Sequence, residues 1–233
     1  KANSLQIPFI LADPGKACKR KSSLEKQSFS YGEYENLTIP LLGAFQIDNA
    51  VLAVQAALEL KRLGYSVPDQ AIYRGLSGTV WPGRFQVLCR KPLFIADGAH
   101  NADASEKFAR SVSFYFTNKR IIYIMGMLKD KEYDQVIRNT YELAEHVITV
   151  TPPLKERALH AYDLAQAVGQ YHNSVTVADS VQEAVEMAYL LAGKDKDCVI
   201  IAFGSLSYLG ELMDVVEHRD TIRRDSHGRS EEN

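Results

Sequence analysis

The stretch RIIYIMGMLKDKEYDQVIRNTYELAEHVITV, residues 120–150, decides the fold class of this chain. It opens on the apolar run Arg120–Met125, whose length and composition suit a strand buried on both faces. Helical sequence of about a dozen residues follows at 131–144, and a second apolar run, Val147–Val150, ends the stretch. A buried strand, a helix and another buried strand make up the repeating unit of a parallel sheet.

The same alternation continues on both sides of this stretch. Further strands are predicted at Phe85–Leu88, Leu93–Ala96, Ser174–Ala178 and Cys198–Phe203. Further helices are predicted at 102–117, 158–170, 180–193 and 206–217. We therefore predict an α/β domain with a Rossmann-like, mainly parallel sheet that is covered by helices on both faces.

The residues before this sheet predict a different architecture. Short strands and turns are indicated within 1–40, and apolar residues at helical spacing predict a helix at about 46–63. Pro68 is predicted to open a second, shorter helix. Two glycines and a proline lie within Ser77–Gly83, where we place a domain boundary. The predicted parts are 1–82, 83–217, and a charged, mobile tail at 218–233.

Composition narrows the class of protein. The chain has 233 residues and a formal net charge of -2, which argues against nucleic acid or an anionic membrane as the main partner. No apolar run reaches the roughly 20 residues that span a bilayer, and no signal peptide is present, so we expect a cytoplasmic protein. We also expect the protein to be a monomer. The three cysteines are too far apart in the sequence to indicate a zinc site or a disulfide framework. Because the chain begins at Lys1 within strand-like sequence, we expect it to be part of a longer protein.

Polar residues follow four of the predicted strands. They occupy 97–101, 126–131, 151–157 and 204–207. In an open parallel sheet, ligands bind beyond the carboxyl ends of the strands, because helix amino termini there present free N–H groups and a partial positive charge. These residues include an acid, an imidazole, several cations and a hydroxyl, a set that suits an anionic substrate handled beside a nucleotide.

Five segments resemble, in order, motifs of the folylpolyglutamate synthases. They are LGAFQIDNA at 42–50, WPGRFQ at 81–86, DGAHN at 97–101, GMLKDK at 126–131 and GSL at 204–206. The resemblance extends to about residue 216, and its DGAHN form favours the folate branch over the peptidoglycan branch of the wider Mur ligase group. The sequence departs from the commonest motif at Phe45, where histidine is frequent.

The resemblance implies an ATP-dependent ligase that joins L-glutamate to the γ-carboxylate of a folate through an acyl phosphate, with ATP and Mg²⁺ as cofactors. Such an enzyme needs a phosphate loop of the form G-x-x-x-x-G-K-[ST], and this string does not occur in the sequence. Residues 1–82 would then be the last part of a Mur-ligase-type central ATPase domain, and 83–217 the glutamate ligase domain. The Mg²⁺ ligands are expected in the missing amino-terminal part, so we expect this chain to be inactive alone.

The resemblance also implies which residues bind ATP. Asn49 is placed at the adenine, because an amide offers both a donor and an acceptor to the base edge. Gln46 lies three residues earlier on the same side of the helix, and ordinary helix capping is the alternative for this pair. Arg84, in the linker, is implied to contact phosphate oxygens, a role suited to its fixed charge and forked donors. The alternative for Arg84 is a surface arginine at a hinge.

Asp97 and His100 are the candidate catalytic residues. The resemblance places Asp97 near the ribose of the nucleotide. It places His100 near the incoming glutamate or the acyl phosphate, where the imidazole either orients a group or carries the proton of the amine. Asn101 is predicted to cap the helix that follows.

Three further residues are candidates for binding glutamate. Lys129 is implied to balance the glutamate carboxylates, and the alternative is a solvated helix start that Asp130 caps. Ser205 either donates a hydrogen bond to the glutamate or only caps a helix. For Arg157, a glutamate-binding role and a purely structural role are likewise both open. The remaining histidines have no ligand spacing and are interpreted as structural or solvent-facing: His146, His160, His172, His218 and His227.

Other functions stay open at the level of the sequence. The complete enzyme could also act as a dihydrofolate synthase, or the chain could belong to a peptidoglycan-type amino-acid ligase. A third alternative is a non-catalytic α/β module that binds a small anion or a partner protein. A nicotinamide-binding domain is not favoured, because no G-x-G-x-x-G string follows any predicted strand.

Overall fold

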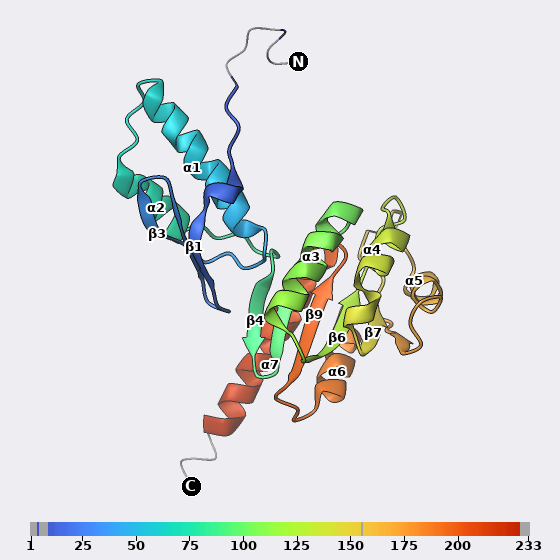
Figure 1. Ribbon diagram of the computed structural model, residues 1–233. Helices are drawn as coiled ribbons and strands as arrows, with labels where there is room; N and C mark the ends of the chain where they lie inside the picture. Colours follow the sequence, from blue (N-terminus) through green and yellow to red (C-terminus); the bar gives the residue numbers. More distant parts are fainter. Residues whose placement is uncertain (1–3, 5–8, 155, 229–233) are drawn as a thin grey trace. The chain divides into compact units, whose positions relative to one another are not determined.

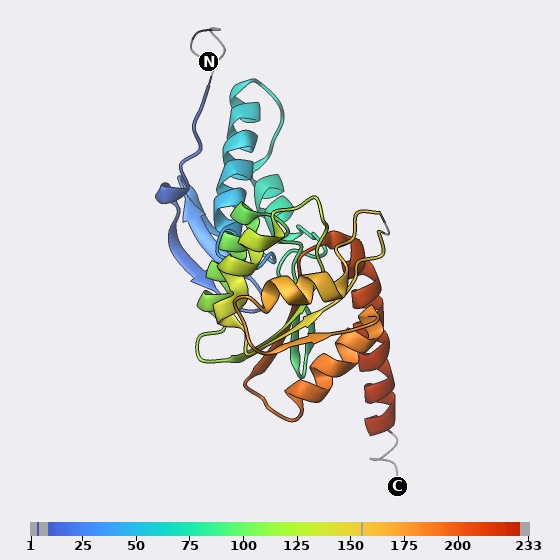
Figure 2. The ribbon, with the colours of Figure 1, turned by 90° about the vertical axis from the view of Figure 1, so that its right-hand side faces the viewer.

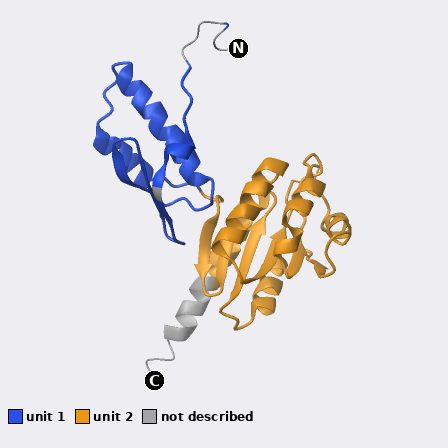
Figure 3. Cartoon of the chain, viewed as in Figure 1, with its two compact units in different colours: residues 1–81 blue, residues 82–233 orange. Residues whose placement is uncertain are grey.

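The structure is a computed structural model that describes residues 4, 9–154 and 156–228, apart from the side chains of residue 19 and residues 220–228. The chain divides into two compact units, Lys1–Trp81 and Pro82–Asn233 (Figure 3). A separate cluster of buried apolar side chains lies in each unit.

Unit 1 contains a small antiparallel sheet with strand order β1-β2-β3. The bounds are β1 Cys18–Ser22, β2 Gln27–Tyr31 and β3 Tyr34–Ile39, followed by the helices α1 Gln46–Arg62 and α2 Asp69–Ser77. Both helices pack on the sheet through one cluster that joins Phe29 and Leu37 to Val51, Val54 and Ile72. The helical spacing of the apolar residues in α1 therefore produces the buried face that the sequence predicts.

The ends of the two helices follow from local chemistry. Gly64, just beyond α1, has a φ of 91° and donates its N–H to the carbonyl of Lys61. Glycine suits this position because it adopts left-handed backbone conformations without a steric penalty. Pro68 is the N-cap of α2, so the helix begins one residue later than predicted.

Unit 2 holds a six-stranded sheet in the order β4-β5-β9-β6-β7-β8. The bounds are β4 Gln86–Arg90, β5 Leu93–Ala96, β6 Arg120–Met125, β7 His146–Thr149, β8 Val175–Val177 and β9 Cys198–Phe203. Only β4 and β5 pair antiparallel, and the other neighbours are parallel. The prediction of a mainly parallel sheet is confirmed.

Helices cover both faces of this sheet (Figures 1 and 2). The helices are α3 Ala102–Tyr115, α4 Tyr133–Thr140, α5 Ala161–Val168, α6 Val181–Ala192 and α7 Leu206–Gly228, with a short 3-10 turn, η3, at Tyr141–Leu143. The strands run onward from β6 to β8, and α6 then returns the chain to β9 in the middle. Because such crossovers are right-handed, the return places α6 on the face opposite α3 and α4.

Successive residues of each central strand point to opposite faces of the sheet, so each alternate set fills one of the two helix–sheet layers. Phe94, Ile122 and Ile200 belong to the cluster that includes α6 and α7. On the other face, the ring of Phe203 stacks on that of Phe108 in α3 at 4.4 Å between centroids. Strands buried on both faces explain why the sequence shows continuous apolar runs rather than alternation.

Three helices differ from the prediction by three residues or more at one end. The segment predicted as one helix at 131–144 is α4 followed by η3, and α5 begins at Ala161 rather than 158. The helix predicted to end at 217 continues as α7 to Gly228, and 229–233 lie outside the described residues. The mobility of the charged tail at 218–233 stays a prediction. Arg219 stays on the helix surface with its guanidinium 4.6 Å from the centroid of the Tyr189 ring, a cation–π contact that favours the extension.

No described helix is both long and apolar enough to cross a membrane. None of Cys18, Cys89 and Cys198 forms a disulfide bond.

Candidate functional site

The connections of unit 2 diverge at the carboxyl ends of its central strands. The turns after β5 and β6 lead to α3 and α4 on one face, whereas the turn after β9 leads to α7 on the other. Such a divergence between neighbouring strands leaves a crevice at the sheet edge, which is the usual ligand site of open α/β sheets. The segments beginning at Asp97, Gly126 and Gly204 meet there.

Glycines allow these turns to approach each other. Gly204 has a φ of 114°, and a Cβ placed on it would lie 2.5 Å from the carbonyl oxygen of Gly126. A Cβ on Gly98 would lie 2.4 Å from Cδ2 of Leu206, at the start of α7. The hydroxyl of Tyr208 donates to the carbonyls of Ile124 and Phe203, at 3.1 and 2.7 Å, so α7 is anchored in the same place.

Asp97 binds main-chain groups of two segments. Its Oδ2 accepts from the N–H of Phe85 and its Oδ1 from the N–H of Ala99, both at 2.8 Å. The N–H of Gly98 donates to the carbonyl of Gly83, also at 2.8 Å. The turn after β5 is therefore tied to the linker residues that precede β4.

The carboxyl group of Asp97 is almost completely buried, with 4% of the residue exposed. Burial raises its pKa to about 6, because a charge is poorly solvated in the interior. The two backbone donors, the charge of Arg84 and the nearby imidazole of His100 act in the opposite direction on this pKa. Asp97 therefore differs from an ordinary surface carboxylate in both its contacts and its titration.

The raised pKa predicts a pH-dependent stability. A folded-state pKa of about 6, against an ordinary 3.8, means that the folded protein binds the proton more tightly. The stabilisation from Asp97 is therefore complete below about pH 4 and is lost as the pH rises through about 6, by about 3 kcal/mol. Urea unfolding between pH 4 and 7.5 should show this fall relative to Asp97→Asn, which lacks the titrating group. A wild-type stability that stays constant relative to Asp97→Asn, or that rises with pH relative to it, would contradict the prediction.

His100 is half-buried in the turn after β5. Its Nδ1 lies 2.8 Å from the carbonyl oxygen of Gly98. Because a carbonyl only accepts, Nδ1 carries the proton of the neutral imidazole. Among the described residues no hydrogen-bond partner is found for Nε2, which is left to accept a proton or a hydrogen bond.

Arg84 lies between the two linker residues that are tied to the turn after β5. Its side chain is half-buried, and its charge lowers the pKa of Asp97. It has no ion pair with another described residue. Its guanidinium is therefore not neutralised by a paired carboxylate and can interact with an anionic group.

The cations predicted to bind glutamate lie on two adjoining turns. The N–H of Lys129 donates to the carbonyl of Arg157 at 2.8 Å, and Leu128 and Ala158 form an isolated antiparallel bridge. Arg157 is paired with Asp130 at 2.6 Å, which lowers the pKa of that carboxyl. Asp130 is thus not a helix cap: α4 begins at Tyr133, with no side-chain cap. Lys129 remains exposed.

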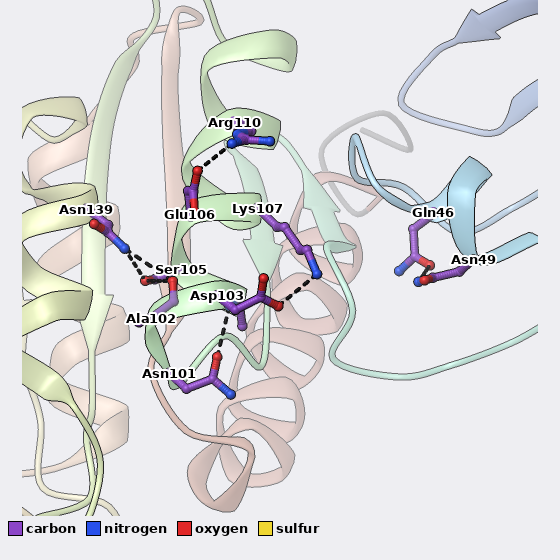
Figure 4. A network of polar contacts seen from close by, with 11 residues as sticks. Gln46, Asn49, Asn101, Ala102, Asp103, Ser105, Glu106, Lys107, Arg110 and Asn139 are labelled. Atoms are coloured by element: carbon purple, nitrogen blue, oxygen red, sulfur yellow. Dashed lines mark hydrogen bonds and ion pairs between the residues drawn. The ribbon is translucent and has the colours of Figure 1, made fainter. Parts of the chain in front are cut away.

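Ser205 and Asn101 cap helices, as the sequence suggested. Ser205 is buried, its Oγ accepts from the N–H of Ser207 at 3.3 Å, and the two hydroxyls are 2.8 Å apart. The side chain of Asn101 accepts from the N–H of Ala104 at the start of α3. Figure 4 shows this cap, and beside it the amide of Asn139, which reaches Ser105 from α4.

Gln46 and Asn49 form a pair within unit 1. The amide of Asn49 donates to Oε1 of Gln46 at 3.0 Å (Figure 4). Gln46 is buried, whereas Asn49 is exposed. The capping alternative for this pair is wrong, because the N-cap of α1 is Phe45 and no side chain caps it. Gln46 instead orients the carboxamide of Asn49.

Three of the remaining histidines have structural contacts. His146 lies between the hydroxyls of Ser174 and Thr176, at 2.6 and 2.8 Å, and burial lowers its pKa. His172 bonds the carbonyl of Ala144, and His160 is the N-cap of α5. His218 is exposed, and the side chain of residue 227 lies outside the description.

No three His, Cys, Asp or Glu side chains of the described residues are grouped so that they could hold a metal ion. The described residues therefore do not fit a Mg²⁺ site that is held by protein ligands alone.

The sequence did not indicate the part that Phe85 has in this site. Its φ is 45°, a conformation that is rare for an aromatic residue. Its ring is fully buried against Phe108, Tyr115 and Phe116. Gly83 and Phe85, the neighbours of Arg84 in the linker, could be recognised in the sequence only as part of a motif. Their backbone conformation leaves no pattern in the composition.

Residues 83–206 match the family described as "Mur ligase, glutamate ligase domain". The chain is 27% identical to the dihydrofolate synthase/folylpolyglutamate synthase of Bacillus subtilis (strain 168) over 193 residues, which are 81% of this chain and 43% of the relative. A structure of E. coli FolC with DHPP and ADP has a TM-score of 0.68 at 26% identity, covering 86% of this chain and 46% of that one. A Mycobacterium tuberculosis folylpolyglutamate synthase structure with ADP and AMPPCP has a TM-score of 0.73 at 23% identity, covering 88% and 47%. The chain spans less than half the length of these proteins.

Proposed function

The chain belongs to the Mur ligase family through its glutamate ligase domain, and on that premise we propose that it is part of an ATP-dependent ligase that joins L-glutamate to the γ-carboxylate of a folate. Relatives from Bacillus subtilis and Escherichia coli, both named dihydrofolate synthase/folylpolyglutamate synthase, support the proposal. The observation that carries it is the turn after β5. There Nε2 of His100 has no hydrogen-bond partner among the described residues, and the linker that holds Arg84, which has no ion pair with any of them, is tied to the same turn.

The reaction must make a carboxylate reactive. Its negative charge repels an incoming amine, so the γ-phosphoryl group of ATP is first transferred to a carboxylate oxygen, with ADP as the leaving group. The amine nitrogen of glutamate then attacks the acyl carbon. The tetrahedral intermediate expels phosphate, and the nitrogen gives up a proton. Positioning and neutralisation of charge supply most of the catalysis.

Residues of unit 2 are proposed for the later part of this reaction. Arg84 stabilises negative charge on phosphate oxygens, since its forked donors match their geometry. Nε2 of His100 takes the proton of the amine or orients the attacking nitrogen. The remaining candidates are proposed to bind the glutamate carboxylates: Lys129, Arg157 and Ser205. Lys129 is favoured over Arg157 for this role, because Asp130 already neutralises much of the arginine charge. Ser205 is a weaker donor, since its hydroxyl is already paired with Ser207.

Residues of unit 1 are proposed for the nucleotide. Asn49 is exposed and oriented by Gln46, so its carboxamide is preset to bond the adenine edge. Residues 1–82 are proposed as the last part of a central ATPase domain, and 83–217 as the glutamate ligase domain. A monomeric state and a cytoplasmic location also remain predictions.

A second acceptor is favoured by the comparisons. Relatives that include those from Bacillus subtilis and Escherichia coli carry the double name dihydrofolate synthase/folylpolyglutamate synthase, and a similar structure contains DHPP. The same chemistry serves a pteroate carboxylate, because only the acceptor changes. We therefore include dihydrofolate synthesis as the alternative function of the site.

The proposal is tested by incorporation of labelled L-glutamate into tetrahydrofolate or dihydropteroate, using the complete ligase of which this chain is proposed to be part. We expect ATP-dependent incorporation, and none from the 233-residue chain alone. His100→Gln should lower kcat by about 100-fold, because general acid–base catalysis is lost. His218→Gln, on the exposed side of α7, is the matched control and should be neutral.

Two results would count against this function. Full activity in His100→Gln would show that the imidazole of His100 does not have the role assigned to it. Absence of ATP-dependent incorporation with every acceptor would favour the non-catalytic α/β module instead.

A further inference from the structure

Four hydrogen bonds form one network over residues 83–85 and 97–100, two of them between the two segments and two within 97–100. The carboxylate of Asp97 accepts from Phe85 and Ala99, and Gly98 donates to Gly83. The carbonyl of Gly98 then accepts from the imidazole of His100. The network therefore connects the backbone on both sides of Arg84 with the side chain of His100.

The backbone around Arg84 is held in an unusual conformation. Gly83 and Phe85 both have positive φ, 72° and 45°. The N–H of Gly83 also donates to Oε1 of Gln86 at 2.9 Å. Glycine adopts a positive φ without strain, but at Phe85 such a conformation persists only where the surroundings fix it, and here the buried ring of Phe85 and the carboxylate of Asp97 do so. The Cα–Cβ direction of Arg84 is thereby set by unit 2.

Both oxygens of the Asp97 carboxylate have a partner within the protein. Each oxygen accepts a main-chain N–H at 2.8 Å, and only 4% of the residue is exposed. A group in this state is poorly placed to bind a nucleotide directly. Its hydrogen bonds instead lead to the main chain next to Arg84 and His100, the two residues to which the reaction is assigned.

We propose that Asp97 is a positioning residue, which fixes Arg84 and His100 relative to each other through the main chain and does not itself contact the nucleotide. This deepens the proposed function and rests on it for the roles of Arg84 and His100. The carboxylate is required because it offers an acceptor to each of two N–H groups. Asparagine has the same shape but only one acceptor oxygen, so one buried N–H loses its partner.

The two hydrogen bonds from Phe85 and Ala99 to the carboxylate of Asp97 form a clamp between the linker and the turn after β5. This clamp is tested on the chain by hydrogen exchange and NMR relaxation, without any assay of activity. In Asp97→Asn the amides of Phe85 and Ala99 should exchange about 10-fold faster or more, relative to the rest of the sheet. Asp103→Asn, an exposed carboxylate in the first turn of α3, is the matched control and should leave both amides unchanged. Equal exchange in wild type and Asp97→Asn would overturn the clamp.

The wild-type protein provides a measurement that needs no folded variant. The backbone amide of Arg84 should have an order parameter of about 0.85, as rigid as the strands. A value below about 0.6 would show a flexible linker and overturn the proposal.

The complete ligase separates positioning from direct contact. A positioning role predicts that Asp97→Asn lowers kcat by about 10-fold, equally with ATP and with its 2′-deoxy and 3′-deoxy analogues, and leaves KM for ATP nearly unchanged. If Asp97 bonds the ribose, the variant raises KM for ATP, and the effect disappears with a deoxy analogue; that result would overturn the proposal. An inactive wild-type ligase would refute the proposed function, whereas the exchange measurements would still decide the clamp.

Discussion

Replacing Phe85 by alanine is expected to lower the free energy of unfolding by about 3–5 kcal/mol. The ring is 0% exposed and lies 6.2, 5.6 and 6.0 Å, between centroids, from Phe108, Tyr115 and Phe116. Its removal leaves a cavity beside α3 that a close-packed interior cannot fill. Urea unfolding followed by circular dichroism measures the loss.

Two further variants separate the contributions to this effect. Phe114→Ala removes a ring that is 61% exposed on the same helix, α3, and should change stability by less than about 0.5 kcal/mol. Phe85→Gly should be at least as stable as Phe85→Ala, because glycine adopts a φ of 45° without strain. If Phe85→Gly is instead less stable than Phe85→Ala, the backbone at this position is not strained, and that part of the explanation fails.

Gly204→Ala is expected to lower the free energy of unfolding by about 3 kcal/mol or more. The φ of 114° is unfavourable for any residue with a side chain. The new Cβ would also lie 2.5 Å from the carbonyl oxygen of Gly126 and 2.8 Å from the sulfur of Met127. The carbonyl belongs to the backbone at the end of β6, so no change of rotamer relieves the contact.

Gly210→Ala is the matched control for this prediction. Gly210 lies within α7, and a Cβ placed on it meets no atom within 4 Å. Alanine should therefore raise stability by about 0.5–1 kcal/mol, because the unfolded chain loses conformational freedom. Thermal unfolding of the two variants should shift in opposite directions. A Gly204→Ala protein as stable as wild type would show that the turns after β6 and β9 are not closely packed.

Much of the candidate site could be located from sequence because its chemistry follows strand ends. The strands Leu93–Ala96 and Cys198–Phe203 were predicted with the bounds that the structure shows. Asp97, His100 and Ser205 come directly after them, so a parallel sheet brings their turns to one edge. Helix caps such as Asn101 were also predictable, since a cap depends on residues only three positions apart.

Other features depended on residues far apart in the chain. The cap predicted for Asp130 was wrong because Arg157 binds its carboxylate, and the helix predicted to end at 217 continues to Gly228. The bond from Asn49 to Gln46, by contrast, is local. Sequence spacing alone does not distinguish it from a helix cap.

By itself, the sequence determined the layered α/β architecture, the order of its elements and the residues at the edge of the sheet, because periodicity and strand ends are local properties of the chain. Only the tertiary structure decided how those residues are used. The carboxylate of Asp97 turns toward the main chain of Phe85, the linker takes a left-handed conformation, and Gly204 lies against Gly126. Each of these depends on packing between segments that the sequence separates, and the buried environment then sets hydrogen bonding and charge.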